Sequence, residues 1–279
     1  MRERIRVQDI GLDRDEIQRR KQFTRDLWQG KPLDHTPVYV TVENPQPKYT
    51  ICEQFLDADK QLEEALTAVD LTWKHVPDGD WVPAMRPDVG CSPLATAFGA
   101  ELYWGNDANQ TCGVKDPPLS DVELAYALAV PPPDAGQLAE GTARVRRFAE
   151  AGEGLISVSL LDMAGGLNVA ADLLSCNQVY EAMYGNPEAL ECLLGKIQQL
   201  FLATIAAQIE AAVQAGEAAV EAGEKAKEAA GAVARKTGEA VEKAADQVAD
   251  AAVKAGEKAV QAGEAAKETA GAVAQKTGA

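Results

Sequence analysis

The sequence predicts an α/β segment over residues 1–212 and a low-complexity tail over residues 213–279. In the front segment, strand-like and helical stretches alternate, which is typical of a parallel sheet with crossover helices. From Ala211 onward the chain contains no aromatic residue, Leu, Ile, Met or Pro, and 26 of its last 69 residues are Ala. Only the front segment therefore has the large apolar side chains from which a core is built.

The expected helices and strands are defined by the spacing of hydrophobic residues and by the Gly and Pro residues that end them. Ile17, Phe23 and Leu27 fall near one face of an amphipathic helix that Gly30 ends. Runs of β-branched and apolar residues favour strands. Helices are expected at 14–30, 57–69, 94–98, 135–151, 168–174, 177–183 and 187–208, and strands at 36–42, 71–76 and 154–161. If the strands are parallel, a ligand site is expected at their carboxyl ends.

The tail is repetitive. Residues 219–239 recur as 259–279 with 16 of 21 positions identical, and glycines follow at intervals of 7, 8 and 7 in each block. Two 11-residue units place such glycines on one stripe of a helix, although each interior Gly costs about 1 kcal/mol relative to Ala. The pattern resembles late-embryogenesis-abundant proteins, which implies a segment that is disordered in water and helical when dry. A solvated linker or an artefactual extension is the alternative.

Charge and cysteine content exclude several classes of function. The formal net charge of −16 argues against binding to nucleic acid or to anionic membranes. No apolar run approaches the roughly 18 residues of a membrane span, and the charged N-terminus precedes no apolar signal region. The five cysteines form no CxxC pair, which favours free thiols in a reducing compartment. A soluble, cytoplasmic protein is expected.

Four segments, in order, resemble the uroporphyrinogen decarboxylase family, which includes corrinoid methyltransferases. They are GKPLDHTPVYV at 30–40, PLATAFGAELYW at 93–104, GGLNVAADLL at 165–174 and YGNPEAL at 184–190. The resemblance covers roughly residues 15–212 and implies a (β/α)₈ barrel. Such barrels usually need about 250 residues. The expectation is therefore a partial TIM-barrel-like segment with exposed strand edges, through which the chain could self-associate.

Two residues are candidates for catalysis. Asp162 directly follows the expected strand at 154–161, and Gly165-Gly166 then lead into a helix whose first N–H groups could hold an anion. His75 ends the expected strand at 71–76 and could act as a general base or hydrogen-bond donor. The alternatives are a helix-capping turn for Asp162 and a hydrogen-bonded rim histidine without a catalytic role for His75.

Four more residues are candidates for substrate binding. Glu43 and Asn44 follow the first expected strand, and Arg86 and Asp107 lie in loops where the family closes its pocket. Exposed loop residues are the alternative for all four. Where the decarboxylases of the family have a pair of arginines, this chain has Glu43-Asn44. An acidic side chain cannot bind substrate carboxylates as arginines do, because the like charges repel.

The zinc site of the methyltransferases uses a His-x-Cys motif, which this sequence lacks, so neither a metal nor a cofactor is expected. The prediction is a protein of this family that is incomplete and not catalytically competent. Its ancestral activity would be decarboxylation or methyl transfer on a tetrapyrrole or corrinoid-linked small molecule. The alternative is a non-enzymatic stress-type or chimeric product.

Overall fold

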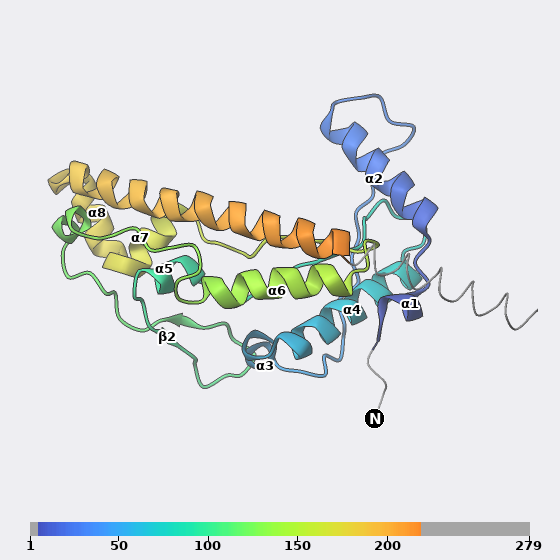
Figure 1. Ribbon diagram of the computed structural model, residues 1–279, viewed down its shortest axis with the longest axis horizontal. Helices are drawn as coiled ribbons and strands as arrows, with labels where there is room; N and C mark the ends of the chain where they lie inside the picture. The colour runs from blue at the N-terminus through green and yellow to red at the C-terminus, as the bar shows by residue number, and fades with distance from the viewer. Residues whose placement is uncertain (1–4, 219–279) are drawn as a thin grey trace, which may run out of the picture. The chain divides into compact units, whose positions relative to one another are not determined.

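The computed structural model describes residues 5–218, which form mainly helices with four very short strands (Figure 1). The helices are Val7–Ile10 (α1), Arg14–Trp28 (α2), Ile51–Leu56 (α3), Ala58–His75 (α4), Pro93–Ala97 (α5), Leu138–Ala151 (α6), Gly166–Leu174 (α7), Cys176–Gly185 (α8), the 3₁₀ turn Val122–Tyr126 (η1) and Pro187–Ala218, here called the long helix. The strands are Ala84–Met85 (β1), Leu102–Tyr103 (β2), Gly113–Val114 (β3) and Ser157–Val158 (β4).

Helix α2 forms where its amphipathic pattern predicts it. The Asp13 carboxylate accepts from the N–H groups of Asp15 and Glu16, which satisfies donors that an uncapped helix leaves free. Ile17 and Phe23 are buried. Gly30 follows with φ of 66°, a left-handed conformation that glycine adopts without strain and that ends the helix.

The strand predicted at 71–76 is wrong, because α4 continues through it to His75. Leu66, Val69 and Thr72 are buried at intervals of three, so the helical face simply extends by one more turn. A short apolar run of this kind cannot be assigned to strand or helix by periodicity alone. His75 is therefore an exposed residue in the last turn of a helix and does not lie at the end of a strand.

The strand predicted at 36–42 is also absent. The segment is fixed by side chains in place of a neighbouring strand. Val38 donates to the Asp80 carboxylate at 2.9 Å, Asp80 N–H donates to Val38 at 2.8 Å, and Val42 N–H donates to the Thr72 hydroxyl at 2.9 Å. No ladder can continue through Pro37, which has no N–H.

One parallel strand pair is present, β1 with β4, in the register Ala84 to Ser157 and Met85 to Val158. Helix α6 lies between these strands in the sequence and is in contact with β4. A second, antiparallel pair joins β2 to β3. Over residues 5–218 the strands do not close into a barrel, so the prediction of a mixed α/β protein is confirmed and that of a barrel is not.

The long helix provides much of the core. A stripe of its side chains is buried at intervals of three and four: Ala189, Leu193, Ile197, Leu200, Thr204, Gln208, Ala211 and Ala215. The first half of the stripe packs on α5, α7 and α8 through residues such as Leu94, Leu173 and Val179. The second half lies along α6 (Figure 1), where Ala212 packs on Val89, Val145 and Leu161.

The long helix would be long and apolar enough to cross a membrane by length and composition alone, with a mean hydropathy of 1.3 over its best 18 residues. Its continuous buried stripe is what a core helix shows. The helix passes through the expected domain boundary at residue 212 without a break. The repeats expected to form a helical or disordered tail, 219–239 and 259–279, lie outside the described residues.

Candidate functional site

The carboxyl ends of β1 and β4 bring together an arginine and two aspartates. Arg86 directly follows β1, and Asp162 follows the extended end of β4. The Arg86 guanidinium lies 3.6 Å from the Asp162 carboxylate and 3.8 Å from that of Asp88. Because neighbouring parallel strands end at the same edge, residues 76 positions apart meet there.

Arg86 and Asp162 both remain accessible. The side chains of Arg86 and Asp162 are 57% and 60% exposed. Their separation is longer than that of a hydrogen-bonded pair, so the guanidinium donors of Arg86 face neither aspartate closely. They are free to bind a ligand that presents oxygen atoms.

Asp88 is the residue that the sequence interpretation missed, and its backbone is the most firmly held part of the site. The side chain of Gln61, which is buried, donates to the Asp88 carbonyl and accepts from its N–H, both at 3.0 Å. Arg144, also buried, donates to the same carbonyl at 2.9 Å. Two buried side chains from α4 and α6 thus fix the loop that carries Asp88.

Burial raises the pKa of the Asp88 carboxyl, and the nearby Asp162 adds to this rise. The N–H of Gly90, which donates to Asp88 at 2.9 Å, and the Arg86 charge oppose it.

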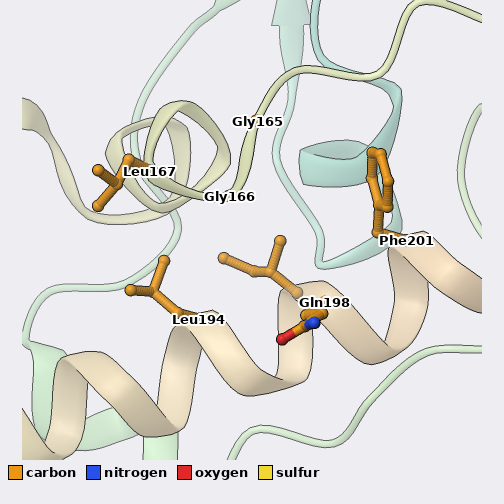
Figure 2. A pocket seen from close by; sticks show the side chains of 7 residues that line it. Gly165, Gly166, Leu167, Leu194, Gln198 and Phe201 are labelled. Carbon is orange, nitrogen blue, oxygen red and sulfur yellow. The ribbon is translucent and has the colours of Figure 1, made fainter.

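An apolar pocket of about 330 Å³ lies close to this cluster along the chain. It is formed by the turn into α7 and by one face of the long helix: Gly165, Gly166, Leu167, Leu194, Ile197, Gln198 and Phe201. Figure 2 shows Leu194, Gln198 and Phe201 projecting from the long helix on the side where the glycine turn lies. Asp162 and Gly165 are three positions apart in the sequence, so their Cα atoms are at most about 11 Å apart.

The remaining predicted residues do not join this cluster. Glu43 is exposed on the 36–44 loop, and Asn44 donates to Glu64 at 3.0 Å while its oxygen accepts from Gln46 N–H. Asp107 caps a turn by accepting from Asn109 N–H at 2.9 Å. His75 lies at the end of α4. The rim position expected for Glu43, Asn44 and His75 depended on the strands at 36–42 and 71–76, which do not form.

The donor set for a zinc site is not assembled in the described part. Over residues 5–218, no three His, Cys, Asp or Glu side chains gather where they could hold a metal ion. The His-x-Cys motif is also missing from the sequence. The residues therefore do not fit the zinc centre that the family resemblance implies.

A methyltransferase from Methanosarcina mazei has a similar fold. The two structures superpose with a TM-score of 0.56 at 19% sequence identity, over 69% of this chain and 56% of that one. The chain thus spans little more than half the length of that methyltransferase, and the likeness concerns the fold alone. No protein-family model matches the sequence, and no curated protein matches it significantly.

Proposed function

We propose that this protein is a small-molecule binding unit of the corrinoid methyltransferase type, with its site at Arg86, Asp88 and Asp162. The observation that carries the proposal is the convergence of these three side chains at the carboxyl ends of β1 and β4. The methyltransferase-like fold supports the class of protein.

The charges of the cluster favour a corrinoid over a porphyrinogen. Uroporphyrinogen carries carboxylates around its ring, which Asp88 and Asp162 would repel. A corrinoid such as cobalamin carries amide groups, which both donate and accept hydrogen bonds. Arg86 would donate to the amide oxygens, and the aspartates would accept from the amide N–H groups. The 330 Å³ pocket can receive the edge of such a ring, but not the whole of it.

We do not expect turnover by the chain as it stands. Glu43-Asn44 stands where the family's decarboxylases have a pair of arginines, and here Asn44 is bonded to Glu64. The His-x-Cys motif is missing from the sequence, and residues 5–218 bring together no set of side chains that could hold the zinc that activates a methyl acceptor. Ligand binding without turnover is the proposed activity, and a non-enzymatic stress-type role is the alternative.

Equilibrium dialysis of the full chain against hydroxocobalamin tests the proposal. Arg86→Ala should weaken binding about tenfold, because a charge-assisted hydrogen bond contributes about 1.5–3 kcal/mol. Lys115→Ala is the matched control, since Lys115 forms a similar exposed pair with Glu101 at 3.9 Å. Binding that is absent, or equally affected by both variants, would contradict the proposed site.

Activity assays separate the two branches of the family. We expect no consumption of uroporphyrinogen, and no methyl transfer from methylcobalamin to a thiol with zinc present. Turnover that disappears in Asp162→Ala would show that the site is catalytically complete and that a binding role alone is wrong.

A further inference from the structure

Two cysteines that are 21 positions apart in the sequence meet beside the candidate site. Cys91 ends the loop between β1 and α5, and Cys112 immediately precedes β3. The Cys91 sulfur lies 2.7 Å from the carbonyl oxygen of Cys112. The Cys112 sulfur lies against Gly90, only 2.5 Å from where a Cβ atom at that position would sit. The Cys91 sulfur therefore lies against the backbone of Cys112, and the Cys112 sulfur lies against the residue that precedes Cys91.

Gly90 makes this approach possible. Its φ of 118° is strained for any residue with a side chain, and a Cβ atom would displace the Cys112 sulfur. The position of Cys91 is fixed from the other side, because the next residue, Ser92, is buried and donates to the Asp172 carboxylate at 2.6 Å.

The two thiols differ in exposure and in acidity. Cys91 is exposed, whereas Cys112 is buried. The pKa of Cys91 is lowered to about 6, chiefly by its side-chain interaction with Cys112. The pKa of Cys112 is raised, chiefly by the same interaction and also by burial, which disfavours its thiolate. An exposed, more acidic thiol beside a buried one is the arrangement of an attacking and a resolving cysteine.

We propose that Cys91 and Cys112 are a reversible redox pair that hydroperoxides oxidise to an intramolecular disulfide. The Cys91 thiolate attacks the terminal oxygen of the hydroperoxide. The O–O bond breaks, the remaining alkoxide or hydroxide takes up a proton, and Cys91 becomes a sulfenic acid. The Cys112 sulfur then attacks the Cys91 sulfur, the S–O bond breaks and water leaves. The two thiols lose two electrons and two protons in total, and a dithiol reductant reverses the reaction.

Hydrogen peroxide at one equivalent per chain tests the proposal on the reduced, full-length protein. Before alkylation, the intact mass should be lower by two hydrogen atoms. After the remaining thiols are alkylated, peptide mapping should show a Cys91–Cys112 crosslink. A dithiol should restore the free thiols. At pH 7, Cys91 should also react with an alkylating probe faster than Cys176, which is an exposed cysteine at the start of α8 and serves as the internal control.

Two variants identify the role of each sulfur. In Cys112→Ser, Cys91 should stop at the sulfenic acid and be trapped by dimedone. In Cys91→Ser, peroxide should leave Cys112 unmodified. The mapping of the wild-type protein decides the question even if a variant folds poorly. Intermolecular disulfides alone, crosslinks to other cysteines, or a Cys91 sulfenic acid that persists in the wild-type chain would overturn the proposal.

Discussion

The side-chain oxygen of Gln208 accepts a hydrogen bond of 3.0 Å from the backbone N–H of Leu161, 47 residues earlier in the chain. Gln208 is completely buried in the long helix, and Leu161 directly precedes Asp162. The side-chain nitrogen of Gln208 also lies 3.9 Å from the sulfur of Met163. One buried amide therefore holds the residues on both sides of a candidate site aspartate.

Gln208→Leu should destabilise the protein by about 1–3 kcal/mol, since the buried N–H of Leu161 would lose its acceptor. Urea unfolding followed by circular dichroism would measure the change. Gln214→Leu is the control on the same helix, because Gln214 is exposed and bonds only to Glu210 in the preceding turn. That substitution should change stability by about 0.5 kcal/mol at most.

The edge position of Asp162 could be predicted because it follows the strand expected at 154–161, within which β4 forms. For Arg86 no preceding strand was predicted, and the sequence placed it only in a loop. Asp88 could not be predicted as a site residue. An aspartate two residues before a glycine indicates only a turn, and such a turn is present, because the Asp88 carboxylate accepts from Gly90 N–H. Its site position depends on Gln61 and Arg144, which come from distant helices and carry no local signal. Cys91 and Cys112 were likewise invisible as a pair, because 21 positions separate them.

Helices were predicted better than strands for a physical reason. The spacing of Ile17 and Phe23, and of the stripe on the long helix, records the face that each helix buries. Of the three strand predictions, the one at 154–161 contains β4. The two that were wrong rested on runs of apolar residues around Val40 and Leu71. Such runs do not reveal whether a neighbouring strand is available to pair with them.

Gly141→Ala should destabilise the protein although alanine favours helices. A Cβ atom at Gly141 in α6 would collide with the buried side chain of Leu161, and overpacking costs about 1–3 kcal/mol. In the long helix, Gly195 has nothing within 4 Å of the corresponding point, so Gly195→Ala should stabilise by about 0.5–1 kcal/mol. Thermal unfolding of the two variants should therefore shift in opposite directions.

Arg20→Met should cost about 3 kcal/mol. Arg20 is buried, bonds to Glu16 at 2.7 Å and to the carbonyls of Pro77 and Trp81, and lies 4.5 Å over the Trp73 ring. Arg19→Met is the matched control, because Arg19 pairs with the same Glu16 from a half-exposed position. Its effect on urea unfolding should stay within about 1 kcal/mol. Equal losses in both variants would show that the buried contacts of Arg20 contribute nothing extra.

The stability contributed by His35 should depend on pH. Its ring nitrogens lie 3.0 Å from Asp80 and 2.7 Å from Asp34, and these carboxylates, Asp80 first, raise its pKa above 6.5. When the pKa of a histidine is higher in the folded state, the protonated ring stabilises the protein at pH values below the unfolded-state pKa. This stabilisation is lost as the pH rises through the folded-state pKa. The difference in unfolding free energy between the wild type and His35→Gln should thus be larger at pH 5.5 than at pH 9.

Gln208 is a polar member of the buried stripe of the long helix, and its bond to Leu161 gives the helix one favoured position along its neighbours. Its leucine-rich turns are chemically alike and would tolerate a shift along α5 and α7. A slide of one turn, about 5.4 Å, would carry Gln208 away from the Leu161 amide and into the place of Ala212. There its amide group would face Val89 and Val145, which offer no hydrogen bond. The side-chain amide of Gln208 thus disfavours sliding of the long helix along its neighbours.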